Sequence, residues 1–130
     1  MIVLDASAAV EYVLDSAAGA EVGRYLDGGT PVHFPELMMV EAVSALRTLT
    51  RAGMLSADRG TEAVLDVLDL DGNRHRHELL LPRAFELRHR FTTYDAVYIA
   101  LAEALAAPLV TGDRRLARGA ADLVGVELVS

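Results

Sequence analysis

Short apolar segments alternate with helix-like segments along the whole chain, and this alternation limits the fold more than any other feature. The expected strands are residues 2–4, 31–34, 108–111 and 126–129, with 74–79 as a short edge strand. The expected helices are residues 7–14, 17–26, 35–52, 56–70, 81–90, 92–106 and 114–122. Because short buried strands that alternate with helices form parallel sheets covered on both faces, we predict an α/β fold. Its expected form is a three-layer α/β/α domain with a central, mainly parallel sheet of four to five strands.

The length of 130 residues and the hydrophobic fraction of 52% predict one compact domain over residues 1–130. The absence of cysteine excludes disulfides and thiolate metal sites. Asp5 interrupts the first apolar run, and Glu103 and Pro108 interrupt the longest later one, so neither a secretory signal nor a membrane span is expected. We therefore expect a soluble, cytoplasmic protein with no membrane partner.

The net charge of −7 argues against a general nucleic-acid coat, because phosphate binding draws on a basic surface. It remains compatible with an acidic active site that metal ions neutralise. All 12 basic residues counted as Lys and Arg are arginine, so chemistry that needs a lysine is excluded.

Two aspartates are expected at one edge of the predicted sheet. Asp5 directly follows the first strand and Asp113 lies just past the strand 108–111. In parallel α/β sheets the binding crevice lies beyond the carboxyl ends of the strands. Both aspartates are equally explained as N-caps of the helices that follow them. Ser7 and Thr111 have a similar ambiguity, since Ser7 is either a helix cap or a hydrogen-bond donor to Asp5, and Thr111 can bond a neighbouring carboxylate.

Two further acids occur on predicted helices. Glu41 lies within an apolar segment of the long helix, on a partly polar stripe with Leu37, Ser44 and Thr48, although a solvated glutamate is the simpler alternative. Asp95 lies in the first turn of a strongly apolar helix, where Thr92-x-x-Asp95 also resembles a capping box. If the four acids converge, their mutual repulsion calls for a cation, and oxygen ligands without cysteine favour Mg²⁺ or Mn²⁺.

Four segments occur in the order typical of one family: MIVLDASA, PELMMVEAVSALR, TTYDAVYIALAEAL and LVTGDRRL. In these segments the chain resembles the PIN-domain ribonucleases, in particular the VapC-type toxins of bacterial toxin-antitoxin pairs. The resemblance implies that the catalytic and metal-binding acids are Asp5, Glu41, Asp95 and Asp113, with Ser7 and Thr111 as supporting hydroxyls. Some members carry a further acid after the fourth, where this chain has Arg114 and Arg115, so the number of metal ions stays open.

The resemblance also implies a function and partners. The function is that of an Mg²⁺- or Mn²⁺-dependent endoribonuclease toxin, which hydrolyses RNA with a metal-activated water and leaves a 5′-phosphate and a 3′-hydroxyl. The partners are a cognate VapB-type antitoxin and a second copy of the chain in a homodimer. The side of the long helix with Met38 and Met39 offers an apolar contact surface, although it is equally explained as core.

Arginines concentrate between residues 74 and 90 and again after Asp113. The candidates for an RNA-binding rim are Arg88, Arg90, Arg114 and Arg115, and the alternative is an ordinary solvated surface.

Two other functions compete with the nuclease. A phosphoryl-transfer enzyme with Asp5 as nucleophile is disfavoured, because dehalogenase-like phosphatases have an aspartate where this chain has Ser7, and the chain has no lysine. A catalytically silent PIN-like module that only binds RNA or protein remains the main alternative, and the four intact acids argue against it.

Overall fold

The computed structural model describes all residues, 1–130, and contains one five-stranded sheet. The strands are β1 (Ile2–Leu4), β2 (Val32–Pro35), β3 (Asn73–His75), β4 (Leu109–Thr111) and β5 (Val126–Leu128). Their order is β3-β2-β1-β4-β5, and every neighbouring pair is parallel. All five strands therefore end at the same edge of the sheet.

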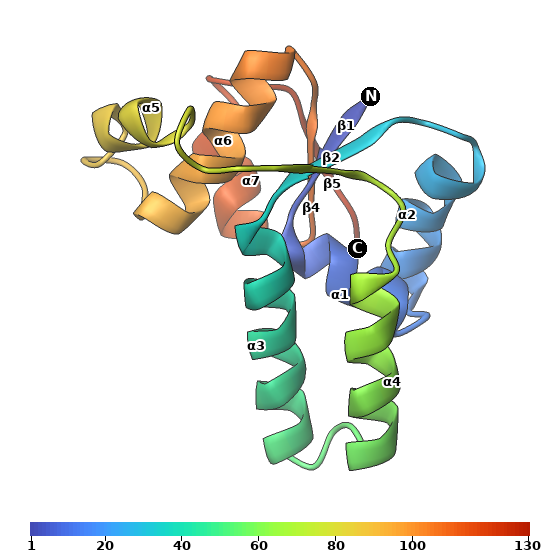
Figure 1. Cartoon of the computed structure of the whole chain (residues 1–130). Coiled ribbons are helices and arrows are strands. Elements are labelled where there is room, and N and C mark those ends of the chain that lie inside the picture. The colour runs from blue at the N-terminus through green and yellow to red at the C-terminus, as the bar shows by residue number, and fades with distance from the viewer.

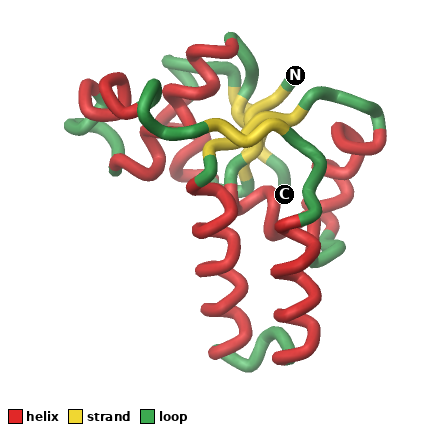
Figure 2. The backbone as a smooth tube through the Cα atoms, in the orientation of Figure 1, coloured by secondary structure: helices red, strands yellow, loops and turns green.

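Seven helices connect and cover the strands. They are α1 (Ala6–Val13), α2 (Ala17–Asp27), α3 (Leu37–Arg51), α4 (Ala57–Leu68), α5 (Leu81–Glu86), α6 (Thr93–Leu105) and α7 (Arg114–Ala120). In Figure 1, α5, α6 and α7 lie on one side of the sheet and α2 lies on the other, while α3 and α4 project below as a pair. Figure 2 shows the strands gathered at the centre of these helices. The predicted three-layer α/β/α fold is confirmed, and its sheet is entirely parallel.

The helix α6 is the central helix of the core. Its residues from Ala96 to Ala102 are all buried, and it packs on β1, β2 and β4. An apolar helix covered on nearly all sides has no freedom to rotate, so its first turn, which carries Asp95, is held in a fixed place. None of the helices combines the length and the apolar character needed to cross a bilayer.

Several element boundaries differ from the predicted ones, and the edge strand β3 ends at His75 instead of Leu79. Pro35 belongs to β2, so α3 begins at Leu37. The helix α5 ends at Glu86 instead of continuing to Arg90. The amides of Arg88 and Arg90 bond to carbonyls three residues earlier, and these tighter turns replace the last part of the expected helix.

The long helix α3 has an N-terminal cap that comes from a distant part of the chain. Glu36 occupies the N-cap position but makes no side-chain cap hydrogen bond. Instead, the backbone N–H of Leu37 donates to Nε2 of His77, at 3.0 Å. Because His77 follows β3, this contact joins the start of α3 to the edge of the sheet.

The methionines at the start of α3 belong to the core side of the helix. Met38 is fully buried, and Met39 is partly buried against the same core. The alternative of an apolar contact surface at these two residues is therefore wrong for Met38. The side chain that α3 leaves most exposed among its large apolar residues is Val40.

Candidate active site

Asp5 is a buried carboxylate at the point where β1 ends and α1 begins. Its Oδ1 accepts the backbone N–H of Ala8 at 3.0 Å, so Asp5 is the N-cap of α1. The same oxygen accepts the Ser7 hydroxyl at 2.7 Å, and Oδ2 accepts the Thr111 hydroxyl at 2.6 Å. Of the two explanations open for Ser7, the structure therefore shows a donor to Asp5, and Asp5 itself caps the helix.

Ser7 and Thr111 join the ends of β1 and β4. The backbone N–H of Gly112 donates to the Ser7 hydroxyl at 2.8 Å, and that of Asp113 donates to Thr111 Oγ1 at 3.0 Å. The two hydroxyls also lie 3.3 Å apart. This network fixes the rotamer of Asp5 and the loop that carries Asp113 as one unit.

Glu41 lies one turn into α3, is half-buried, and has a hydrogen-bond partner that the sequence did not predict. The hydroxyl of Tyr98, on α6, donates to Glu41 Oε1 at 2.6 Å. Tyr98 is buried, and burial followed by the nearby Glu41 raises its pKa far above the ordinary value, so the hydroxyl keeps its proton. A tyrosine within an otherwise apolar buried helix is the sequence signal for such a partner, because a buried hydroxyl needs a hydrogen bond.

Asp95 and Asp113 share a cation. Nη2 of Arg115 lies 2.9 Å from Asp95 Oδ2 and 3.6 Å from Asp113 Oδ2. Asp113 Oδ1 also accepts the backbone N–H groups of Arg115 and Leu116, so Asp113 is the N-cap of α7. Thr92 caps α6 by accepting the backbone N–H of Asp95. The carboxylate of Asp95 itself accepts a hydrogen bond from Arg115.

The acids influence one another electrostatically. Burial raises the pKa of Asp5, and the charge of Asp113 raises it further, while the hydrogen bonds from Thr111, Ala8 and Ser7 lower it. The pKa of Glu41 is raised by burial and by the charge of Asp95, against the hydrogen bond from Tyr98. The charge of Asp113 thus acts on Asp5 and that of Asp95 acts on Glu41, and a cation near either pair of carboxylates is favoured.

The donor set suits a hard divalent cation. It consists of carboxylates and hydroxyls, which are the ligand types that Mg²⁺ and Mn²⁺ take in proteins. No three acidic or histidine side chains lie close enough together to form a ready-made metal cage. Since Mg²⁺ keeps several of its waters and binds through one or two carboxylates, the residues fit an ion that is held partly through water.

The four arginines of the expected RNA-binding rim have different surroundings. Arg88 lies with its guanidinium 4.5 Å from the centroid of the Phe85 ring, and Arg115 pairs with the two acids described above. Arg90 donates to Asp122 and to the carbonyl of Gly119, so it fastens the segment after α5 to the end of α7. Arg114 takes part in none of the ion pairs.

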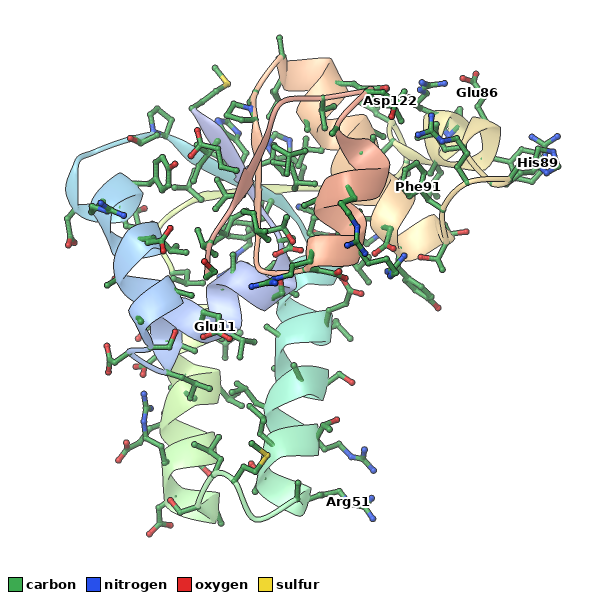
Figure 3. All side chains as sticks on the ribbon, turned by 180° about the vertical axis from the view of Figure 1, so that it is seen from behind. Glu11, Arg51, Glu86, His89, Phe91 and Asp122 are labelled. Carbon is green, nitrogen blue, oxygen red and sulfur yellow. The ribbon has the colours of Figure 1, made fainter.

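Figure 3 shows the whole chain with its side chains, seen from behind relative to Figure 1. It shows Phe91 and Asp122 on the side where α7 approaches the segment after α5, with Glu86 and His89 further out and Arg51 at the far end of α3. The hydrogen bonds of Arg90 to Asp122 and Gly119 anchor these two segments to each other, whereas Arg88 and Arg114 pair with no acid.

Substituting Asp5 with asparagine is expected to change the pH dependence of stability in the metal-free protein. The pKa of Asp5 is raised in the folded protein above its ordinary value of 3.8, so the folded state binds more protons than the unfolded state above that pH. The free energy of unfolding of the wild type should therefore fall, relative to that of Asp5→Asn, as the pH rises from below 3.8 through the raised pKa. Urea unfolding in EDTA across this pH range measures the difference. A difference that is independent of pH would contradict the raised pKa.

Substituting Tyr98 with phenylalanine is expected to lower the free energy of unfolding by about 1–2 kcal/mol, because the half-buried Glu41 carboxylate loses a charge-assisted hydrogen bond. Urea denaturation measures the change. The matched control is Tyr94→Phe on the same helix, where the tyrosine is exposed. Equal losses in the two variants would show that the hydroxyl of Tyr98 contributes nothing specific.

The fold is a parallel α/β domain in which Asp5 and Asp113 directly follow two neighbouring strands, β1 and β4. The chain belongs to the PIN domain family, whose model matches residues 2–122.

The curated relatives are VapC ribonucleases. The chain is 42% identical to "Ribonuclease VapC12" of Mycobacterium tuberculosis over 130 residues, which are 100% of both chains. It is 40% identical to "Ribonuclease VapC1" of the same organism over 117 residues, which are 88% of this chain and 87% of that one. Among solved structures it is similar to VapBC2 from Rickettsia felis, bound to a DNA fragment from their promoter. In that comparison the TM-score is 0.68 and the identity 14%, with 100% of both chains covered.

Proposed function

We propose that this chain is an Mg²⁺- or Mn²⁺-dependent endoribonuclease, built as a single PIN domain over residues 1–130. The observation that carries the proposal is that Arg115 lies between Asp95 and Asp113, while Asp113 acts electrostatically on Asp5 and Asp95 on Glu41, in a fold shared with ribonuclease relatives. The relative named Ribonuclease VapC12 supports it, because the identity of 42% extends over the whole of both chains.

Different neighbouring groups hold Asp5 and Glu41 in position. Asp5 accepts hydrogen bonds from the hydroxyls of Ser7 and Thr111, which fix the orientation of its carboxylate. Glu41 is held through Oε1 by Tyr98, which leaves Oε2 as its free oxygen. Together with Asp95 and Asp113, these groups would hold a divalent ion, which supplies a bound water of lowered pKa and offsets negative charge on the phosphodiester.

RNA binding to a chain with a net charge of −7 requires local positive charge. Of the four arginines expected at the RNA-binding rim, Arg88 and Arg114 pair with no acid and are the first candidates to meet phosphates. The exposed Phe85, which packs against Arg88, offers a flat face on which a base can stack.

The same family relationship carries the proposal of a toxin-antitoxin pair. We expect a cognate VapB-type antitoxin in the cytoplasm, and a homodimer of this chain. The exposed apolar side chains Val40 and Phe85 are available for such contacts, whereas Met38 is not.

RNA cleavage with and without divalent ions tests the nuclease. The purified chain is incubated with a mixture of structured RNAs in EDTA and then in Mg²⁺ or Mn²⁺. We expect no cleavage in EDTA, and products with a 5′-phosphate and a 3′-hydroxyl once the ion is added back. Binding of RNA without cleavage in either ion would contradict the nuclease and favour the alternative of a catalytically silent PIN-like module.

A further inference from the structure

Arg115 is held by two of the four acids through both its side chain and its backbone. Its guanidinium Nη2 lies 2.9 Å from Asp95 Oδ2 and 3.6 Å from Asp113 Oδ2, and its backbone N–H donates to Asp113 Oδ1 at 2.8 Å. No other arginine in the chain pairs with any of the four acids. Arg115 is therefore the only arginine of the chain that forms an ion pair with any of these acids.

The two sides of this ion pair differ in exposure. The Asp95 side chain is 17% exposed, whereas the Arg115 side chain is 65% exposed. The carboxylate is thus nearly fixed, while the guanidinium has open solvent on most sides and sits on a long, flexible stem. Rotation of the Arg115 side chain can break the pair without any change in the backbone.

We propose that Arg115 competes with the divalent ion for Asp95 and Asp113, and that the displaced guanidinium then binds a phosphate of the RNA. This inference rests on the proposed metal-dependent ribonuclease activity. An ion pair that exists only in the metal-free state lowers the affinity for the metal, because the ion must break it on binding. A guanidinium released beside the reacting phosphodiester is suited to bidentate phosphate binding. Metal binding and substrate binding are then coupled through one side chain.

The first test measures Mn²⁺ binding to the full chain by calorimetry, without RNA. We expect Arg115→Gln to bind Mn²⁺ about two- to fivefold more tightly than the wild type, which is the range for an exposed ion pair. Arg115→Lys keeps the positive charge and should bind Mn²⁺ nearly as weakly as the wild type. The matched control is Arg118→Gln, which removes the same charge from the same helix at a residue without an acidic partner. It reports the long-range effect of the charge alone.

The second test measures RNA cleavage at saturating Mn²⁺. Under these conditions competition with the metal no longer matters, so the loss of the phosphate contact should raise the KM of Arg115→Gln about tenfold and change kcat much less. Tighter Mn²⁺ binding combined with a higher KM is the signature of the proposed exchange, because a purely structural role would not move the two in these directions.

The outcomes separate this inference from the function on which it rests. If the wild type fails to bind Mn²⁺, the proposed metal-dependent function is overturned. If the wild type binds Mn²⁺ but Arg115→Gln binds it no more tightly than Arg118→Gln, only the competition is overturned. Weaker binding by Arg115→Gln would show that the arginine helps to assemble the metal site.

Discussion

Asp5→Asn is expected to lower the rate of RNA cleavage by at least about 100-fold. Loss of a group that only orients a metal ligand costs about 10- to 100-fold, and Asp5 is proposed as a ligand itself. Asparagine keeps an oxygen that can accept the Ala8 N–H, so the N-cap of α1 survives the substitution. The loss should therefore appear in the cleavage rate and in Mn²⁺ affinity, measured on a protein that remains folded.

Two further variants isolate this effect. Asp5→Ala removes both the charge and the cap, and it should lose about 1 kcal/mol of stability more than Asp5→Asn does. Asp58→Asn makes the same chemical change at an exposed position in the first turn of α4 and should cleave like the wild type. Cleavage by Asp5→Asn at the wild-type rate would contradict the assignment of Asp5 to the metal site.

Phe34→Ala is expected to lower the free energy of unfolding by about 3–5 kcal/mol. Phe34 is 0% exposed and is among the largest fully buried side chains, in the strand that leads into α3. Its removal leaves a cavity that the sheet and its flanking helices cannot fill by relaxation. Since a loss of this size is a large part of a domain's total stability, urea denaturation should show a much lower midpoint.

The surface offers a matched control for Phe34. Phe85 is 66% exposed, and the guanidinium of Arg88 lies over its ring. Phe85→Ala should therefore cost less than about 1 kcal/mol. A similar cost at both positions would mean that Phe34 does not occupy the tightly packed core that the structure describes.

The order of helices and strands could be predicted from the sequence because each element carries its own local signal. The strand β1 is a continuous apolar run, and α6 combines the Thr92 cap with a strongly apolar segment. The boundary of α5 could not be predicted in this way. Residues 87–90 have the composition of a helix, but their backbone hydrogen bonds are those of tight turns that lead the chain back towards the cap of α6.

The candidate acids, too, could be predicted from the sequence only in part. Asp5 and Asp113 directly follow strands, so a parallel sheet is enough to bring them to one edge. Their capping of α1 and α7 does not exclude a functional role, because in each case the carboxylate has an oxygen that accepts no backbone N–H. The roles of all four acids in metal binding and catalysis stay predictions.

What the sequence by itself determined is the fold class, and it supplied the four candidate acids as a prediction, because apolar periodicity and short motifs are local properties of the chain. The tertiary structure decided which groups those acids meet. Tyr98 bonds to Glu41, which is 57 residues away in the sequence, and Arg115 bonds to Asp95, which is 20 residues away. Such partnerships depend on how helices pack on a shared sheet, and side chains that are distant in the sequence carry no local pattern that records them.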